Sequence, residues 1–290
     1  MIILGVAFAL LIGISLGLLG GGGSILTVPI LLYVFSLPAR QAIATSLLVV
    51  GTTSAAALIP HARAGNVQWR TGAIFGATSM VGAYAAGRVA KFIPAAALIL
   101  AFGVMMVVTA VAMMRGRKTT AASQVSHEPR HLPVGKIVAE GLVVGAVTGL
   151  VGAGGGFLVV PALVLLGGLP MGVAVGTSLM VITMKSFAGF AGYLSSVSIP
   201  WSIAGMVVVA AVMGSFLGAR LVKRIHPERL RKGFAWFVIV MAVFILGQEV
   251  PKLFGLQVTV ATHWPWLLAA MAVPPAIGGL LSLRREHAPA

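Results

Sequence analysis

The chain has no cysteine and no aspartate, and charged residues make up only 9% of its 290 residues. The absence of cysteine excludes disulfides, thiolate metal sites and cysteine nucleophiles. The absence of aspartate leaves few carboxylates for acid–base catalysis or for the oxygen cages that bind Mg²⁺ and Ca²⁺. From this composition we expect no bound metal, no cofactor and no enzymatic activity.

Polar residues are too few to surround the core of a soluble protein. A typical soluble domain has about 25% charged residues, whereas 59% of this chain is hydrophobic. The net charge of +15 could indicate nucleic acid binding, but the basic residues are scattered between apolar runs and do not form a solvated basic face. The composition therefore predicts a membrane protein whose surroundings are a lipid bilayer, with no nucleic acid partner.

Long apolar segments predict several membrane-spanning helices. A spanning helix needs about 20 mostly apolar residues. Segments of about this kind lie at 1–19, 40–60, 70–88, 95–114, 137–152, 171–192, 201–219, 233–249 and 263–283. Two shorter apolar runs, 23–36 and 156–168, follow glycine clusters and are typical of broken or re-entrant helices. The predicted fold is an all-α polytopic membrane protein.

The two halves of the chain resemble each other. A shift of 132 residues places 17–50 on 149–182 without a gap, with 16 identical residues. Matches in the same register include a Pro, a Thr-Ser-Leu triplet, a Trp and an Arg-x-x-Lys motif. A duplication of this kind is the repeat architecture of secondary transporters.

The duplication divides the sequence into four parts. They are a transmembrane repeat at 1–114, a cytoplasmic linker at 115–136, a second transmembrane repeat at 137–249, and an extra C-terminal transmembrane helix with a short tail at 250–290.

The distribution of Lys and Arg predicts that the second repeat is inverted relative to the first. If each glycine cluster reverses the chain, 15 basic residues face the cytoplasm and 4 face outside. Without those reversals the counts are 11 and 8. Short loops rich in Lys and Arg stay in the cytoplasm, so the inverted arrangement fits better. It places the N-terminus outside and the C-terminus in the cytoplasm.

The glycine clusters are the first candidates for a binding site. Backbone N–H groups at the start of a half-helix are free to bind an anion, and glycine allows close approach of a ligand. Close packing between helices is the alternative explanation. The substrate-binding candidates in these clusters are Gly22, Gly23, Ser24, Gly154, Gly155 and Gly156.

Two hydroxyl pairs and one lysine are further substrate-binding candidates. The hydroxyl pairs occupy matching positions in the repeats, Thr45-Ser46 and Thr177-Ser178. They could donate to sulfonate or carboxylate oxygens, or bond to their own helices. Lys185 is the only basic residue well inside a predicted span, where charges are usually functional. Its alternative role is to extend toward the membrane surface.

Glu140 and His61 are the candidates for proton coupling. Glu140 lies near the inner end of its span, where it could relay a proton or pair with Lys136 four residues earlier. Histidine side chains can change charge near neutral pH. His61, however, lies at the end of a span, which favours a solvated side chain.

One composite motif occurs in both halves. GLLGGGGSILTVPILL followed by LPARQAIATSL is repeated as GLVGAGGGFLVVPALVLLGGLPMGVAVGTSL. These segments resemble the TauE/SafE sulfite exporter family, and the resemblance extends over about residues 5 to 250. The resemblance implies a permease of the bacterial inner membrane built from a duplicated unit. It further implies proton-coupled transport of sulfite, sulfoacetate or other organosulfonates.

Three hypotheses follow from the sequence and the resemblance. The first is a secondary transporter, expected to be an exporter, that moves small anions by alternating access between inverted repeats. The second is a passive anion channel that uses the same groups without coupling. The third is a membrane subunit of a larger assembly. Helix faces rich in small residues would also suit a homo-oligomer.

Overall fold

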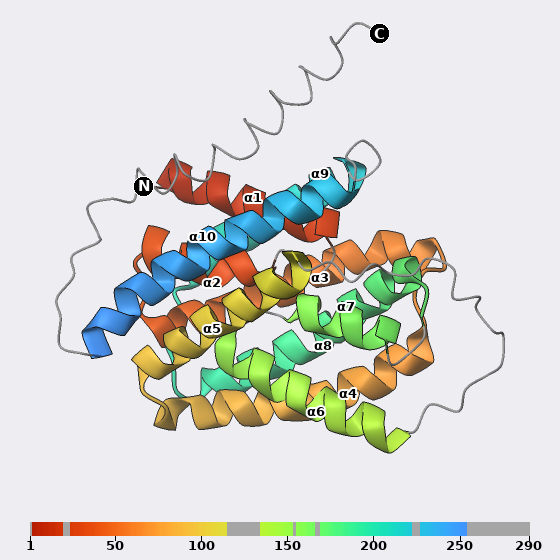
Figure 1. Ribbon diagram of the computed structural model, residues 1–290, viewed down its shortest axis with the longest axis horizontal. Coiled ribbons are helices and arrows are strands. Elements are labelled where there is room, and N and C mark those ends of the chain that lie inside the picture. Colours follow the sequence, from red (N-terminus) through yellow and green to blue (C-terminus); the bar gives the residue numbers. More distant parts are fainter. Residues whose placement is uncertain are drawn as a thin grey trace, which may run out of the picture. The chain divides into compact units, whose positions relative to one another are not determined.

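The computed structural model describes residues 2–19, 24–114, 134–152, 155–165, 169–221 and 227–253. These residues form helices joined by short loops and contain no strand (Figure 1). Most of the predicted linker and the predicted span at 263–283 lie outside them. Val134 to Lys136, which the sequence assigned to the end of the linker, form the first turn of a helix.

The described residues form eight long helices and four shorter helical segments. The long helices are α1 (Ile2–Leu19), α3 (Ala39–Arg63), α4 (Trp69–Val89), α5 (Ala95–Met114), α6 (Val134–Val151), α8 (Met171–Leu194), α9 (Trp201–Leu221) and α10 (Pro227–Leu253). The shorter ones are α2 (Thr27–Pro29), the π-helix η2 (Ile30–Val34), the 3₁₀-helix η3 (Ala90–Phe92) and α7 (Gly156–Leu165).

Several of the helices are apolar along much of their length, as membrane helices are. Three stretches of the described residues are long and apolar enough to cross a bilayer, namely Ala39–Arg63, Gly172–Leu194 and Trp201–Gly218. The two short apolar runs predicted after the glycine clusters form α2 with η2, and α7. The expected all-α polytopic membrane fold is confirmed.

The helix boundaries repeat with the shift found in the sequence. Adding 132 to the bounds of α1 gives the bounds of α6, and adding it to those of α4 gives the bounds of α9. Adding 132 to the first residue of α5 gives the first residue of α10. The turns also repeat. The N–H of Leu37 donates to the Leu31 carbonyl, and the N–H of Leu169 donates to the Leu163 carbonyl. Prolines Pro38 and Pro170 then precede α3 and α8 with the same backbone angles. The duplicated sequence therefore forms duplicated local structure.

The described chain divides into two compact units, and these are not the two sequence halves. The first comprises 1–98 and 120–224, and the second comprises 99–119 and 225–290. The first unit thus contains helices of both repeats, whereas the second contains most of α5 and all of α10.

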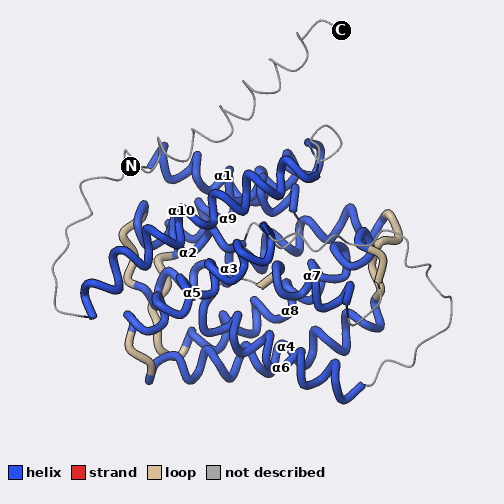
Figure 2. The backbone as a smooth tube through the Cα atoms, in the orientation of Figure 1, coloured by secondary structure: helices blue, strands red, loops and turns tan. Residues whose placement is uncertain are grey.

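Within the first unit, helices of one repeat pack against helices of the other. Helix α1 lies against α9, and α6 lies against α4 (Figure 2). Glycines permit both close crossings: a β-carbon on Gly13 would collide with the Ala211 carbonyl, and one on Gly145 would collide with the Ser79 carbonyl. Gly13 and Gly145 occupy matching repeat positions, and so do their partners Ser79 and Ala211. The two repeats are therefore interleaved.

Helices α3 and α8 pack against each other at the centre of this arrangement (Figure 1). Leu47 lies beside Gly189, Gly51 beside Ser186, and His61 beside Gly176. Residue numbers rise along α3 as they fall along α8, so these repeat-related helices are antiparallel. The direction in which each helix crosses a bilayer stays a prediction.

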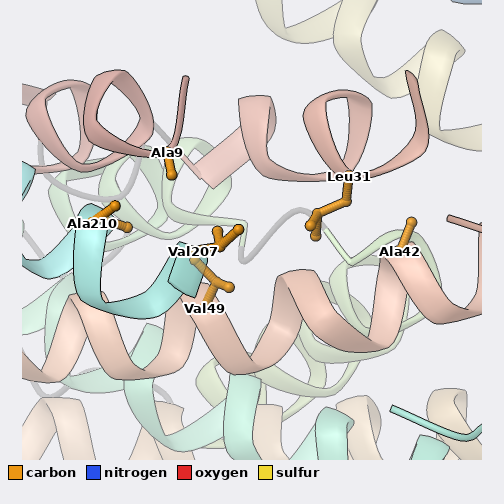
Figure 3. Packing of buried hydrophobic residues seen from close by; sticks show 7 residues of the cluster. Ala9, Leu31, Ala42, Val49, Val207 and Ala210 are labelled. Atoms are coloured by element: carbon orange, nitrogen blue, oxygen red, sulfur yellow. The ribbon is translucent and has the colours of Figure 1, made fainter. Parts of the chain in front are cut away.

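Two hydrophobic clusters hold the short helical segments in place. In the first, Leu31 of η2 packs with Ala42 and Val49 of α3 and with Val207 of α9 (Figure 3). In the second, the matching residues Leu163, Ala174, Val181 and Phe75 form the same set of contacts for α7. Between membrane helices such clusters are stabilised by van der Waals packing rather than by removal of apolar surface from water. Each short segment is thus packed against a long helix of the first unit, and in α7 the packing includes Val159 of its first turn.

Candidate functional site

The glycine-rich turn between α6 and α7 is bound by both central helices. Gly152 and Gly155 have φ values of 74° and 61°, in the left-handed region that glycine adopts readily. The Ser46 hydroxyl of α3 donates to the Gly152 carbonyl over 2.6 Å. A β-carbon on Gly155 would lie 2.5 Å from Lys185 Nζ of α8. Glycine therefore suits the left-handed turn, and a β-carbon at Gly155 would also collide with the Thr148 side chain.

Lys185 lies inside the protein rather than at a membrane surface. Its side chain is 1% exposed, and Nζ donates to Thr148 Oγ1 of α6 over 3.0 Å. Thr148 Oγ1 in turn donates to the Val144 carbonyl over 2.7 Å, so its lone pairs are available to the lysine. The sequence alternative, in which Lys185 extends to the membrane surface, does not match this position.

The buried amino group of Lys185 has no carboxylate beside it among the described residues. Among the described residues, no carboxylate pairs with Lys185, and Thr148 is its hydrogen-bond partner. Burying an unpaired ion carries an effective free-energy cost of roughly several kcal/mol. An anion bound beside Nζ would offset that cost directly, because it would supply the missing charge. The arrangement is therefore chemically suited to a small anion.

The four predicted hydroxyls have different environments. All four side chains are buried. Ser46 binds the glycine turn, as described above, whereas Thr45 Oγ1 has no hydrogen-bond partner. In the second repeat, Thr177 Oγ1 accepts a hydrogen bond of 2.9 Å from the backbone N–H of Gln68, and Ser178 donates to the Val175 carbonyl over 2.7 Å. The matching positions are therefore not chemically equivalent.

The glycine-cluster candidates are partly described. Ser24 is buried in the 3₁₀ turn that precedes α2, and Gly156 is buried at the first residue of α7. The backbone carbonyl of Gly155 accepts N–H groups from Leu158 and Val159 in the first turn of α7. Gly22, Gly23 and Gly154 lie outside the described residues.

The proton-coupling candidates lie away from the glycine turn along their helices. Glu140 is half-buried on α6, eight residues before Thr148, which is roughly 12 Å along the helix axis. His61 is half-buried near the end of α3, and its Cβ is 3.3 Å from a β-carbon built on Gly176. Gly176 is nine residues before Lys185, or roughly 13 Å along α8. Neither candidate joins the Lys185 group in this geometry.

Thr148 was not predicted from the sequence. Its repeat mate is Leu16, so the duplication that drew attention to the other hydroxyls gives no signal for it. A single threonine in an apolar helix is more often bonded to its own backbone. Only the packing of α6 against the centre of the unit shows that its oxygen faces Lys185.

Two short matches to enzyme motifs need separate comment. His127 and His131 flank Glu128 with the spacing of a helical zinc site, but they lie outside the described residues, and proline at 129 is unfavourable inside a helix. The Gly-x-Ser-x-Gly sequence at 13–17 lies within the continuous helix α1. It lacks the strand–turn–helix that exposes a nucleophile. Neither match supports a catalytic site.

Comparison with known proteins agrees with this description. A family model described as "Sulfite exporter TauE/SafE" matches residues 5–245. A probable membrane transporter protein of Xylella fastidiosa is 34% identical over 242 residues, which cover 82% of this chain and 92% of the relative. A probable membrane transporter protein of Methanocaldococcus jannaschii is 30% identical over 253 residues, covering 81% and 92%. No solved structure matches.

The family assignment accounts for the apolar helices and the repeated glycine-proline motif. The family model covers most of the chain, and the relatives are named as transporters rather than as enzymes. The chain is a multi-pass membrane protein of the sulfite exporter TauE/SafE family, a family of membrane transporters.

Proposed function

We propose that this chain is a secondary transporter that exports small sulfur oxyanions, such as sulfite, sulfoacetate or other organosulfonates. The observation that carries the proposal is Lys185, a fully buried basic side chain without a carboxylate partner among the described residues, which a bound anion would keep protonated. The family's printed description, sulfite exporter, supports the choice of anion. Gly155, Thr148 and Ser46 hold the surrounding groups in place.

Alternating access between inverted repeats is the mechanism that we propose. The antiparallel packing of α3 and α8 supports it, because an inverted pair of repeats must contain helices related in this way. Gln41 at the start of α3 donates to Ser198 after the end of α8, whereas the loop after α3 contacts the start of α8. The two loops therefore lie at opposite ends of the helix pair. We assign the uncharged 195–200 loop to the outer side of a bacterial inner membrane and the C-terminus to the cytoplasm.

Coupling to the proton gradient is part of the same proposal. Glu140 and His61 stay its candidate carriers, because both are half-buried titratable groups on helices of the first unit. Their separation from Lys185 means that coupling would act through helix movement rather than through a direct proton transfer to the substrate.

Flux from proteoliposomes loaded with a permanently ionised sulfonate, and separately with sulfite, tests the function. We expect protein-dependent efflux that saturates with concentration. If anion and proton move together, an acidic lumen accelerates sulfonate efflux; if they exchange, an acidic exterior accelerates it. An efflux rate that does not change with the pH gradient would indicate uncoupled transport or a channel. Correctly folded protein that carries none of these anions would contradict the proposal.

A further inference from the structure

Two buried serines stand at matching positions on the central helices. Ser54 of α3 and Ser186 of α8 are related by the 132-residue shift. Both side chains are fully buried, and neither hydroxyl has a hydrogen-bond partner. Buried hydroxyls without partners are uncommon in folded proteins and call for an explanation.

Neighbouring hydroxyls on the same helices show the ordinary arrangement. Thr52 and Thr53 donate to the carbonyls four residues earlier in α3, and Thr183 does the same in α8. This local bond is the usual way to satisfy a hydroxyl in an apolar helix. Ser54 and Ser186 could form the same bond, but neither does. An apolar environment is therefore not sufficient to explain them.

Ser54 and Ser186 differ from the other unpartnered hydroxyls because they occupy equivalent positions in the two repeats. Thr27, Thr45 and Ser79 are also buried without partners. Their repeat mates are Val159, the hydrogen-bonded Thr177, and Ala211. Among the described residues, Ser54 and Ser186 are thus the one repeat-related pair in which both hydroxyls lack a partner.

Ser186 lies on the face of α8 that packs against α3. A β-carbon on Gly51 would be 3.3 Å from Ser186 Cβ. Gly51 and Ser54 are three residues apart in α3, so their β-carbon positions are about 5–6 Å from each other. Ser54 is therefore one helical turn from the α3 position that contacts Ser186, and Ser186 directly follows Lys185 in α8.

We propose that Ser54 and Ser186 form a hydroxyl subsite that donates one hydrogen bond each to two oxygens of the transported sulfur oxyanion. The proposal rests on the proposed function, since it assigns a subsite for the same substrate. A sulfite or sulfonate group offers three acceptor oxygens to donors from different directions. One serine from each antiparallel helix supplies equivalent donors to the anion as access changes from one side to the other.

The test combines anion binding with stability in the absence of anion. The variants are S54A, S186A and the double variant, with S79A as the matched control because Ser79 is buried and unpartnered but has no serine mate. The purified full chain is titrated with sulfite and with sulfoacetate. We expect each single variant to bind about tenfold more weakly and the double variant about a hundredfold more weakly. The S79A variant should bind as the wild type does.

Thermal unfolding without anion provides the second readout. Removing an unpartnered hydroxyl should leave the melting temperature unchanged or raised. A clear fall in the melting temperature of S54A or S186A would show that these hydroxyls are bonded within the protein, and would overturn the subsite. Wild-type affinity in the double variant would also overturn it. If the wild type itself binds neither anion, both the proposed function and the subsite are wrong. If the wild type binds an anion and the double variant binds it equally well, only the subsite is wrong.

Discussion

At the scale of single residues, the interior of the first unit contains groups that lack the partners they would ordinarily have. Lys185 lacks a carboxylate among the described residues, and several buried hydroxyls lack acceptors. In a chain with five acidic residues in total, few carboxylates exist that could have paired with the lysine. The sequence identified Lys185 because a charge inside an apolar span is rare. It could not show that Thr148 contacts it.

The substitution Lys185→Met separates a substrate role from a structural one. Replacing a buried unpaired charge by an apolar side chain of similar length should leave the free energy of unfolding unchanged or increase it. A charge-assisted hydrogen bond contributes about 1.5–3 kcal/mol, so anion affinity should fall roughly 10- to 100-fold. The exposed Lys91→Met is the control. Binding titrations and thermal unfolding of both variants provide the measurement. Unaltered anion binding by K185M would show that Lys185 is not part of the anion-binding site.

At the scale of helices, glycine determines how closely the repeats interleave. Gly145 of α6 lies on the Ser79 backbone of α4, and Gly13 of α1 lies on the Ala211 backbone of α9. Small residues are the usual means by which membrane helices approach each other. The helix positions themselves were predictable, because each depends on a local run of apolar residues between charges or turn residues. The pairing of α1 with α9 and of α6 with α4 was not, since many helix faces carry small residues.

A larger side chain at Gly145 should force α4 and α6 apart. Its β-carbon would collide with backbone atoms, which cannot move as a flexible side chain can. We expect Gly145→Leu to lower the free energy of unfolding by at least about 1–3 kcal/mol. Gly205→Leu is the matched control, because no atom lies within 4 Å of its β-carbon position. Size-exclusion profiles and melting temperatures in detergent would compare the two; equal stability would show that the α4–α6 crossing is not as close as described.

At the scale of the whole molecule, the main question is how the duplicated repeats relate to the membrane. The charge distribution predicts inversion, and the antiparallel packing of α3 and α8 agrees with it. Exposed residues at matching positions, Ala64 after α3 and Ser196 after α8, provide labelling sites on the two loops. The chain contains no cysteine, so a single introduced cysteine can be labelled without other changes.

Ala64→Cys and Ser196→Cys should react from opposite sides of the membrane. In right-side-out spheroplasts, we expect a membrane-impermeant maleimide to label S196C at once and A64C only after permeabilisation. The physical reason is the cytoplasmic retention of the loop between α3 and α4, which is flanked by Arg63 and Arg70. Labelling after permeabilisation controls for reactivity. Equal labelling of both sites in intact spheroplasts would indicate parallel repeats and contradict alternating access between inverted ones.

The class of protein, the helix positions and the duplication could all be predicted from the sequence. They depend on the length of apolar runs, the spacing of charges and the repetition of motifs, which are local properties of the chain. The sequence also identified most of the residues that surround the α6–α7 turn, including Ser46, Gly155 and Lys185. Which of these side chains contact each other, and which have hydrogen-bond partners, could be seen only in the folded structure. Hydrogen-bond partners such as Thr148 for Lys185 come from distant segments, and their orientation depends on how the helices pack. For the same reason, the unpartnered state of Ser54 and Ser186 became visible only in the folded chain.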